Sequence, residues 1–270
     1  MLAACLAFRN TASYLREWLL FHLAVGFDHF YLYNNDSTDD FAPVLTPFRA
    51  LTHHGAPLIE LIEWPGVAQQ LPIYNDCLRR AAANPAVGWL AFIDDDEFLY
   101  PATDQTMPDV LRAFEPYAGV AVCWQLYGSS GRIHYDDDWV IRRFTRRAGG
   151  PDQHAKCIVR PTRVVKALVS GHQFEPQPGF GVVDEKHRPL TTTLNPCPSA
   201  DLLRINHYLT KSIEELVVRR TSREIDVGDK NKLPLLEWVR LDRNWNAVED
   251  RSAQRLEPRM RQLAAELNRA

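Results

Sequence analysis

The chain has 270 residues, of which 46% are hydrophobic and 24% are charged, and its formal net charge is −3. This is the composition of an ordinary globular protein, and it excludes a collagen, a coiled coil and a disordered chain. Because 31 basic residues are balanced by 34 acidic ones, the chain has no overall positive field to hold a nucleic-acid backbone, and we expect no nucleic-acid partner.

The cysteines and the N-terminus indicate the compartment. Five scattered cysteines without a Cys-x-x-Cys pair favour free thiols in a reducing environment over disulfides or a zinc site. The first eight residues are apolar but follow no basic region, which is typical of a strand rather than of a signal peptide. No stretch approaches the roughly 18 apolar residues of a membrane span. We therefore expect a soluble, cytoplasmic protein with at most peripheral membrane contact.

The first half of the chain alternates between strand and helix patterns. A helix is predicted between a cap at Asn10 or Thr11 and a stop at Gly26, and a second helix over residues 67–81. Apolar or aromatic runs typical of strands cover residues 2–8, 28–33, 57–62 and 88–93. Strands and helices that alternate with short connections predict an α/β fold with an open, mostly parallel sheet.

The second half is less periodic. Residues 176–198 are rich in proline and are predicted to form a loop. Strand patterns cover residues 119–127, 140–144, 157–159 and 202–208, and helical patterns cover 212–223 and 257–267. We find no internal repeat and no low-complexity tract.

Three polar clusters follow strands of the predicted sheet. They are Arg9-Asn10, residues 34–39 and residues 94–97. In open α/β sheets, ligands bind beyond the carboxyl ends of the strands. The three clusters therefore predict a ligand site at one edge of the sheet.

The cluster Asp94-Asp-Asp-Glu97 directly follows a buried strand. Four consecutive carboxylates repel one another unless cations compensate, and oxygen ligands suit Mg²⁺ and Mn²⁺. Alternation along an extended segment would put Asp94 and Asp96 on one side and Asp95 on the other. Asp94 and Asp96 are thus the expected metal ligands, and the alternative is a solvated acidic turn.

Further short motifs are spread along the chain from Leu6 to about Asp250. They include Phe8-Arg-Asn10, Tyr14-Leu-Arg-Glu-Trp18, His29-Phe-Tyr-Leu-Tyr-Asn34, Asp36-Ser-Thr-Asp39, Tyr74-Asn-Asp-Cys77, Trp89-Leu-Ala-Phe-Ile-Asp-Asp-Asp-Glu-Phe98, Lys156-Cys-Ile-Val-Arg-Pro161 and Asn206-His-Tyr208. In this order they resemble the bacterial glycosyltransferase family 2-like proteins, which are related to the family 92 glycosyltransferases.

The resemblance implies a GT-A fold, Asp94 and Asp96 as a DxD motif that binds Mn²⁺ or Mg²⁺, and a nucleotide-diphosphate sugar donor, with UDP favoured. It also implies an inverting hexosyltransferase-type enzyme that acts on a carbohydrate or lipid-linked acceptor in glycan or polysaccharide synthesis. We expect one catalytic domain over residues 1–250 and a C-terminal helix in 251–270. Residues 1–100 would form the nucleotide-binding half, and residues 101–250 the acceptor-side half.

The same resemblance suggests roles for individual residues. His207 is expected as a third metal ligand, with His172 as second choice. Arg219 and Arg220 could bind the diphosphate, but pairing with Glu214 and Glu215 on the same predicted helix favours a surface position. The general base is expected to be Asp184, with Asp152 and Glu175 as alternatives. The expected nucleotide-binding residues are Phe8, Arg9, Asn10, Asn34, Asp36, Asp94, Asp95, Lys156 and Lys211.

Two departures from the resemblance keep other functions open. Thr11 replaces an acidic residue that many relatives carry, and Asn34 and Asn35 stand where family 2 enzymes have carboxylates. A catalytically degenerate nucleotide- or glycan-binding protein of the same fold is therefore one alternative. A nucleotidyltransferase, which also uses Asp-x-Asp, is another, but it would need a further carboxylate on a neighbouring strand and a glycine-rich basic loop.

Overall fold

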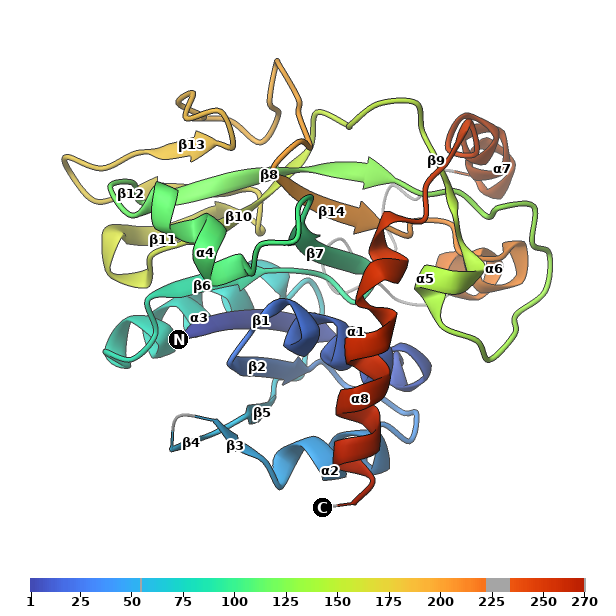
Figure 1. Cartoon of the computed structure of the whole chain (residues 1–270), viewed down its shortest axis with the longest axis horizontal. Coiled ribbons are helices and arrows are strands. Elements are labelled where there is room, and N and C mark those ends of the chain that lie inside the picture. Colours follow the sequence, from blue (N-terminus) through green and yellow to red (C-terminus); the bar gives the residue numbers. More distant parts are fainter. Residues whose placement is uncertain (54, 222–233, 270) are drawn as a thin grey trace.

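The computed structural model describes residues 1–53, 55–221 and 234–269. In this part of the chain, nine strands form a central sheet (Figure 1). Eight of them are ordered β5 (Ile59–Glu63), β2 (His29–Asn34), β1 (Leu2–Phe8), β6 (Trp89–Phe92), β10 (Ala155–Val159), β8 (Gly119–Leu126), β14 (Leu203–His207) and β7 (Glu97–Pro101), and β13 (Val182–Asp184) pairs with β8 off this path.

The sheet is mostly parallel, as predicted. Strands β5, β2, β1 and β6 pair in parallel, and β13 and β14 pair in parallel with β8. Strand β10 is antiparallel to both of its neighbours, and β7 is antiparallel to β14. The expected α/β fold class is thus confirmed.

The remaining elements flank this sheet. The helices are α1 (Ala12–Val25), α2 (Ala42–Arg49), α3 (Gln70–Ala83), α4 (Met107–Leu111), α5 (Val140–Arg143), α6 (Ile213–Thr221), α7 (Leu235–Asn244) and α8 (Glu257–Leu267), with short 3₁₀ turns at Arg112–Phe114, Pro161–Arg163 and Ser252–Leu256. Small two-stranded ribbons pair β3 (Thr52–His53) with β4 (Ala56–Pro57), β11 (Val164–Val169) with β12 (Gln173–Pro176), and β9 (Arg146–Arg147) with β15 (Val248–Glu249). None of the described helices is long and apolar enough to cross a membrane.

Strand β1 separates two hydrophobic cores. Its residues alternate between the sheet faces because side chains in a strand have a period of two. Leu6 and Phe8 belong to a core that also contains residues of α1 and α8, whereas Cys5 and Ala7 belong to a core with α3. Burial on both faces explains why the β1 sequence is apolar throughout.

The elements of the second half differ from the sequence predictions at two places. Residues 140–144 were expected as a strand, but Val140–Arg143 form the helical turn α5. The buried Glu17 carboxylate of α1 accepts the Val140 and Ile141 N–H groups at 2.6 and 3.1 Å, and this long-range cap favours a helical turn. The predicted loop at 176–198 also contains a strand, β13.

The C-terminal helix is confirmed over the predicted residues, as α8 (Glu257–Leu267). Met260 and Leu267 on this helix are buried in the core that contains α1. The helix therefore adds to the main core instead of lying apart from it (Figure 1).

A buried histidine joins α1 to β7. The His22 ring is fully buried, its Nδ1 lies 2.8 Å from the Trp18 carbonyl oxygen, and its Nε2 accepts the Leu99 N–H at 3.2 Å. A neutral imidazole satisfies both contacts, with one ring nitrogen as donor and the other as acceptor. Burial lowers the pKa of His22 to about 3. Stability from this group is therefore present above its unfolded-state pKa of about 6.5 and is lost as the pH falls towards 3.

We predict that this histidine makes the fold sensitive to mild acid. Between pH 7 and pH 5 the unfolded chain binds a proton at His22 and the folded chain does not, which lowers the free energy of unfolding by about 2 kcal/mol. Urea unfolding at both pH values should show this extra loss in the wild type relative to His22→Gln. The raised pKa values of other buried groups contribute equally to both proteins, so equal losses would contradict the prediction.

Candidate functional site

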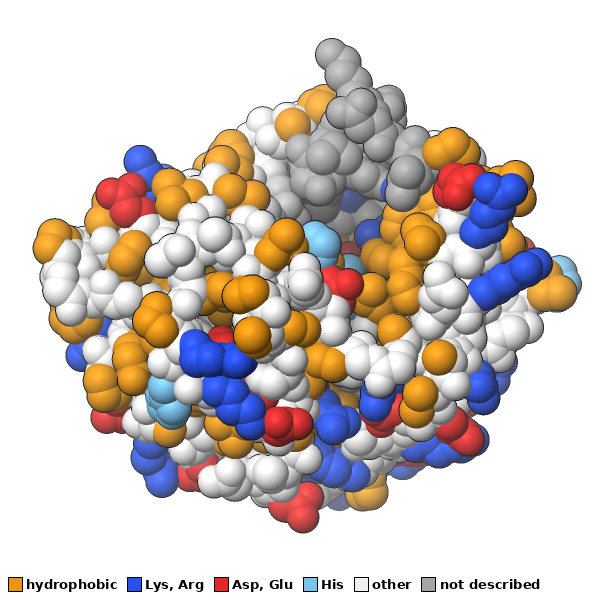
Figure 2. All heavy atoms as spheres, turned by 90° about the horizontal axis from the view of Figure 1, so that it is seen from above, with side chains coloured by type: hydrophobic (Ala, Val, Ile, Leu, Met, Phe, Trp, Pro, Cys, Tyr) orange, Lys and Arg blue, Asp and Glu red, His pale blue; other side chains and the backbone are white. Residues whose placement is uncertain are grey.

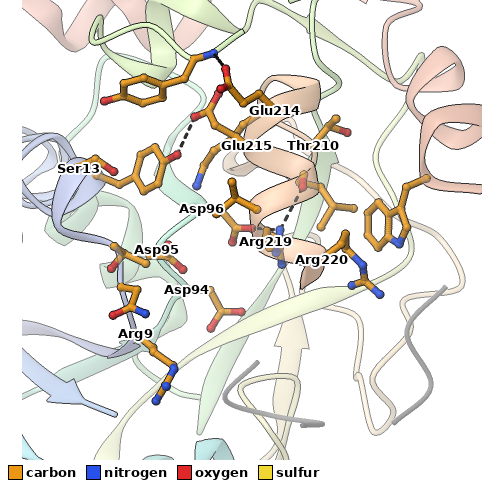
Figure 3. A pocket seen from close by; sticks show the side chains of 18 of the residues that line it. Arg9, Ser13, Asp94, Asp95, Asp96, Thr210, Glu214, Glu215, Arg219 and Arg220 are labelled. Carbon is orange, nitrogen blue, oxygen red and sulfur yellow. Dashed lines mark hydrogen bonds and ion pairs between the residues drawn. The ribbon is translucent and has the colours of Figure 1, made fainter. Parts of the chain in front are cut away.

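A cavity of about 610 Å³ opens at the carboxyl ends of β1 and β6. Figure 2 shows a hollow on this face of the molecule. The loop after β1 and the start of α1 form one wall, and α6 forms the opposite wall. The turn Asp94–Asp96 after β6 lies between them (Figure 3). The predicted meeting of polar clusters at one sheet edge is therefore what the structure shows.

The loops after β1 and β2 are tied to each other. Asn10, which has a positive φ of 53°, accepts the Thr38 N–H at 2.6 Å, and Arg9 donates to the Asn35 carbonyl oxygen at 2.8 Å. Asp39 accepts the Ala12 N–H at 2.7 Å and so caps the start of α1. Arg9 and Asn10 line the cavity, and the loop after β2 supports them from behind.

The acidic segment is a turn, not an extended strand. The Glu97 N–H donates to the Asp94 carbonyl oxygen at 3.1 Å, and the fully buried Glu97 carboxylate accepts the Asp94 N–H at 2.9 Å. Because of this turn all three aspartates line the cavity, whereas strand alternation would have turned Asp95 away. Burial raises the pKa of Glu97 to about 7, although Lys156 acts to lower it.

Two cations neutralise this turn from opposite sides. The Lys156 ammonium is buried and lies 2.7 Å from the Asp94 carboxylate, which also accepts the Tyr74 hydroxyl at 2.8 Å. Burial acts to raise the pKa of Asp94, but Lys156 outweighs it and holds that pKa below its ordinary value. Arg219 of α6 donates to Asp96 at 2.6 Å (Figure 3).

The pKa of Asp96 is lowered by basic side chains on both α6 and β14. Burial again acts to raise its pKa, but Arg219 and then His207 outweigh it and hold the pKa well below its usual range. The His207 Nε2 atom lies 3.4 Å from the Asp96 carboxylate. By contrast, burial raises the pKa of Asp95, even though Lys211 acts to lower it.

The donor atoms of this turn suit a hard divalent cation, because carboxylate oxygens and one imidazole are present. In the described ranges, however, no three His, Cys, Asp or Glu side chains converge closely enough to hold a metal ion. The Asp96 oxygen that faces His207 is taken by Arg219, whose side chain is 41% exposed. The residues therefore fit a cation chemically, while Arg219 occupies one of the two oxygens of the Asp96 carboxylate.

The α6 wall depends on a buried ion pair. Arg143 donates twice to the Glu215 carboxylate, at 2.9 and 3.0 Å, and both side chains are less than a tenth exposed. Glu215 also accepts the Tyr14 hydroxyl at 2.7 Å, and the Lys211 ammonium lies 3.5 Å from the centre of the Tyr14 ring. These contacts hold Lys211 at the cavity, where it was expected.

The other expected nucleotide-binding residues lie behind the cavity. Phe8 is buried in the core, Asn34 donates to Glu63 at 2.6 Å, and Asp36 accepts the Gly66 N–H at 3.0 Å. Lys156 does not line the cavity, but its ammonium contacts Asp94, which does. These four residues shape the edge of the sheet without lining the cavity.

The three candidates for the general base do not line the cavity either. The Asp184 carboxylate is bound by the Arg188 guanidinium at 2.6 Å and by Asn195 at 3.2 Å. Burial acts to raise the pKa of Asp184, but Arg188 outweighs it and holds that pKa low, so this carboxylate is occupied by an ion pair away from the cavity. Glu175 lies on β12 and pairs with Lys166 on the surface.

The sequence favoured a surface position for Arg219 over a role in the site, whereas the structure places it in the cavity wall. Pairing four residues apart had suggested that Glu215 would neutralise it. Glu215 instead pairs with Arg143, which lies 72 residues earlier, so Arg219 is left to reach Asp96. No local pattern around Arg143 indicates this contact.

The sheet and the acidic turn beside a cationic wall are the features expected of a GT-A type glycosyltransferase. The sequence pattern of glycosyltransferase family 92 matches residues 2–243. This chain therefore belongs to glycosyltransferase family 92, and the predicted relationship is confirmed.

Curated relatives carry the same family name. A glycosyltransferase family 92 protein of Oryza sativa subsp. japonica is 30% identical over 187 residues, which cover 68% of this chain and 31% of that protein. One of Ricinus communis is 26% identical over 245 residues, which cover 85% of this chain and 41% of that protein. The chain thus spans well under half the length of these relatives.

Similar solved structures are more distant. An active-site mutant of LgtC is 10% identical with a TM-score of 0.40, covering 92% of this chain and 97% of that one. HddC from Yersinia pseudotuberculosis is 8% identical with a TM-score of 0.35, covering 76% and 89%.

We predict that Arg143→Met destabilises the fold, because it leaves the Glu215 carboxylate buried without its cation. The expected loss in the free energy of unfolding is about 3–5 kcal/mol, measured by urea denaturation. The double variant Arg143→Met/Glu215→Gln removes the unpaired charge and should recover much of this loss. A double variant as unstable as the single one would show that packing, not charge, explains the effect.

Proposed function

We propose that this chain transfers a sugar from a nucleoside-diphosphate donor, with UDP-sugars favoured, to a hydroxyl group of a carbohydrate or lipid-linked acceptor. The observation that carries this proposal is the cavity in which Asp94, Asp95 and Asp96 face the cationic Lys211 and Arg219. Such a site offers ligands to a cation and to a diphosphate at once. The family assignment supports the same class of reaction.

Each wall of the cavity has its own role in this proposal. Arg9, Asn10 and Asp95 would contact the nucleoside. Lys211 and Arg219 would bind the diphosphate oxygens, because guanidinium and ammonium groups form strong charge-assisted hydrogen bonds to phosphate. Their positive charge would also stabilise the nucleoside diphosphate as it leaves.

A divalent cation, Mn²⁺ or Mg²⁺, is part of the proposal. Asp94, Asp96 and His207 would hold it, and when bound it would neutralise charge on the diphosphate leaving group. Arg219, displaced from Asp96, would then bind phosphate instead. Lys156 would keep Asp94 ionised and oriented throughout, since its ammonium is buried against that carboxylate.

Inversion at the anomeric carbon is also proposed, together with a place in glycan or polysaccharide synthesis. Inversion requires a base that removes the proton of the acceptor hydroxyl as its oxygen attacks. A nucleotidyltransferase and a degenerate binding protein remain the competing functions.

We predict that the protein binds UDP more tightly with Mn²⁺ than without it, and that Asp96→Ala removes this difference. The reason is that Asp96 would be a cation ligand. Isothermal titration with UDP, in Mn²⁺ and in chelator, measures the effect. Asp104→Ala is the matched control, because Asp104 is an exposed aspartate outside the cavity. Unchanged cation-dependent affinity in Asp96→Ala would contradict the assignment of this site.

A second measurement separates a catalyst from a degenerate binder. With water as acceptor, a glycosyltransferase should release UDP slowly from a UDP-sugar, and Asp96→Ala should abolish this release. Cation-dependent UDP binding without any release would favour the binding protein instead.

A further inference from the structure

A histidine and an aspartate outside the cavity form a dyad that the proposed function has not used. The Asp152 carboxylate lies 2.6 Å from the Nδ1 atom of His154 and also accepts the His154 backbone N–H at 2.9 Å. The Asp152 N–H is itself bonded to the Trp124 carbonyl oxygen at 2.8 Å. The carboxylate therefore fixes the orientation of the imidazole, as in catalytic pairs where an acidic group holds a histidine base.

The dyad lies at the same edge of the sheet as the acidic turn. His154 immediately precedes β10, and strand residues two apart project to the same face, so His154 lies on the face of Lys156. The Lys156 ammonium reaches Asp94. Since β10 is antiparallel to β6, His154 lies one strand repeat, about 7 Å, beyond Lys156 towards the carboxyl end of β6.

Aromatic contacts connect the dyad to the Asp96 side as well. The His154 ring stacks on Trp124, with centroids 5.2 Å apart and planes 21° apart. Trp124 also contacts His207, whose ring centroid lies 4.4 Å from that of Trp124 and whose Nε2 lies 3.4 Å from the Asp96 carboxylate. A chain of contacts from His154 through Trp124 and His207 thus links the dyad to Asp96.

Nearby groups are less suited to accept a proton. His172 packs against Trp124, but its Nδ1 lies 2.8 Å from the Ala155 carbonyl oxygen, and burial lowers its pKa to about 4, assisted by Lys156. Glu215 is bound by Arg143, and Glu214 accepts the Tyr135 N–H at 2.8 Å. The His154 side chain is 51% exposed, and its Nδ1 is the ring nitrogen that faces Asp152.

We propose that His154 is the general base of the transfer reaction and that Asp152 is its positioning residue. This inference rests on the proposed function. The acceptor hydroxyl oxygen bonds to the anomeric carbon as the bond from that carbon to the phosphate oxygen breaks. The electron pair of the broken bond leaves with the nucleoside diphosphate, and the hydroxyl proton moves to His154 Nε2. Asp152 stabilises the imidazolium that forms.

The test uses the full chain, Mn²⁺ and the UDP-sugar that gives the largest thermal shift among UDP-glucose, UDP-galactose and UDP-N-acetylglucosamine. UDP release with water as acceptor is measured beside UDP affinity. His154→Ala should slow release by about 10²- to 10⁴-fold and leave UDP affinity within twofold. Added imidazole should restore part of the rate, because it replaces the missing base. His187→Ala is the matched control, since this exposed histidine also stacks on an aromatic ring, that of Phe114.

Asp152→Asn tests the positioning role. It should lower kcat without raising KM, and the double variant Asp152→Asn/His154→Ala should be no slower than His154→Ala alone, because both residues act through one proton transfer. Losses that multiply in the double variant would overturn the dyad.

Other outcomes separate this inference from the function on which it rests. If His154→Ala keeps its rate within threefold while Asp96→Ala loses cation-dependent UDP binding, the base assignment is wrong and the proposed function stands. A lost rate that imidazole does not restore, or that comes with lost UDP affinity, also overturns the assignment. If the wild type binds no UDP with Mn²⁺, the proposed function fails and this inference fails with it.

Discussion

The ion pair between Lys156 and Asp94 is the constraint on which the site depends. An acidic turn that follows a buried strand concentrates negative charge where solvent cannot screen it well. Lys156 supplies a buried compensating charge from β10, the strand that pairs with β6. The Glu97 carboxylate closes the turn by accepting a hydrogen bond from the Asp94 N–H. With these two contacts in place, the three aspartates can stay together at the floor of an open cavity.

The cationic groups around the turn differ in what they can do. Lys156 is buried, lies outside the lining of the cavity and holds Asp94 through its ammonium. Arg219 comes from the opposite wall and is partly exposed, so it can exchange Asp96 for another anion. Lys211 lies on the Tyr14 ring. Lys156 and Lys211 are therefore held in place, whereas Arg219 is the cation of this group with an exposed side chain.

Much of the fold followed from the sequence, because hydrophobic periodicity is a local signal. The apolar run of β1, the helix that ends at Gly26 and the C-terminal helix were found almost to the residue. Gly26 could be recognised as a stop because its φ of 104° is accessible to glycine at little cost. The helical turn α5 was missed because its cap, Glu17, comes from more than a hundred residues away.

The site was predictable to the extent that topology determines it. Parallel strands bring their carboxyl ends together, so Arg9, Asn10 and the acidic turn could be placed at one edge in advance. The partners of those residues could not, because an ion pair such as Arg143 with Glu215 depends on tertiary packing. The same limitation applies to Asp184. Its position in the sequence after the acidic turn suggested a general base, but its ion pair with Arg188 could not be predicted from the sequence.

Helix α1 has a consequence for how the chain can be divided. Its side chains reach three separate parts of the second half: Tyr14 contacts Glu215 on α6, Glu17 caps α5, and α8 packs along its buried face. The sheet also interleaves the halves, since β7 (Glu97–Pro101) pairs with β14 (Leu203–His207), which lies about a hundred residues later. A gene split just after β7 would therefore yield two fragments that each lack part of a core, and they could regain the cavity only by reassembling as a pair.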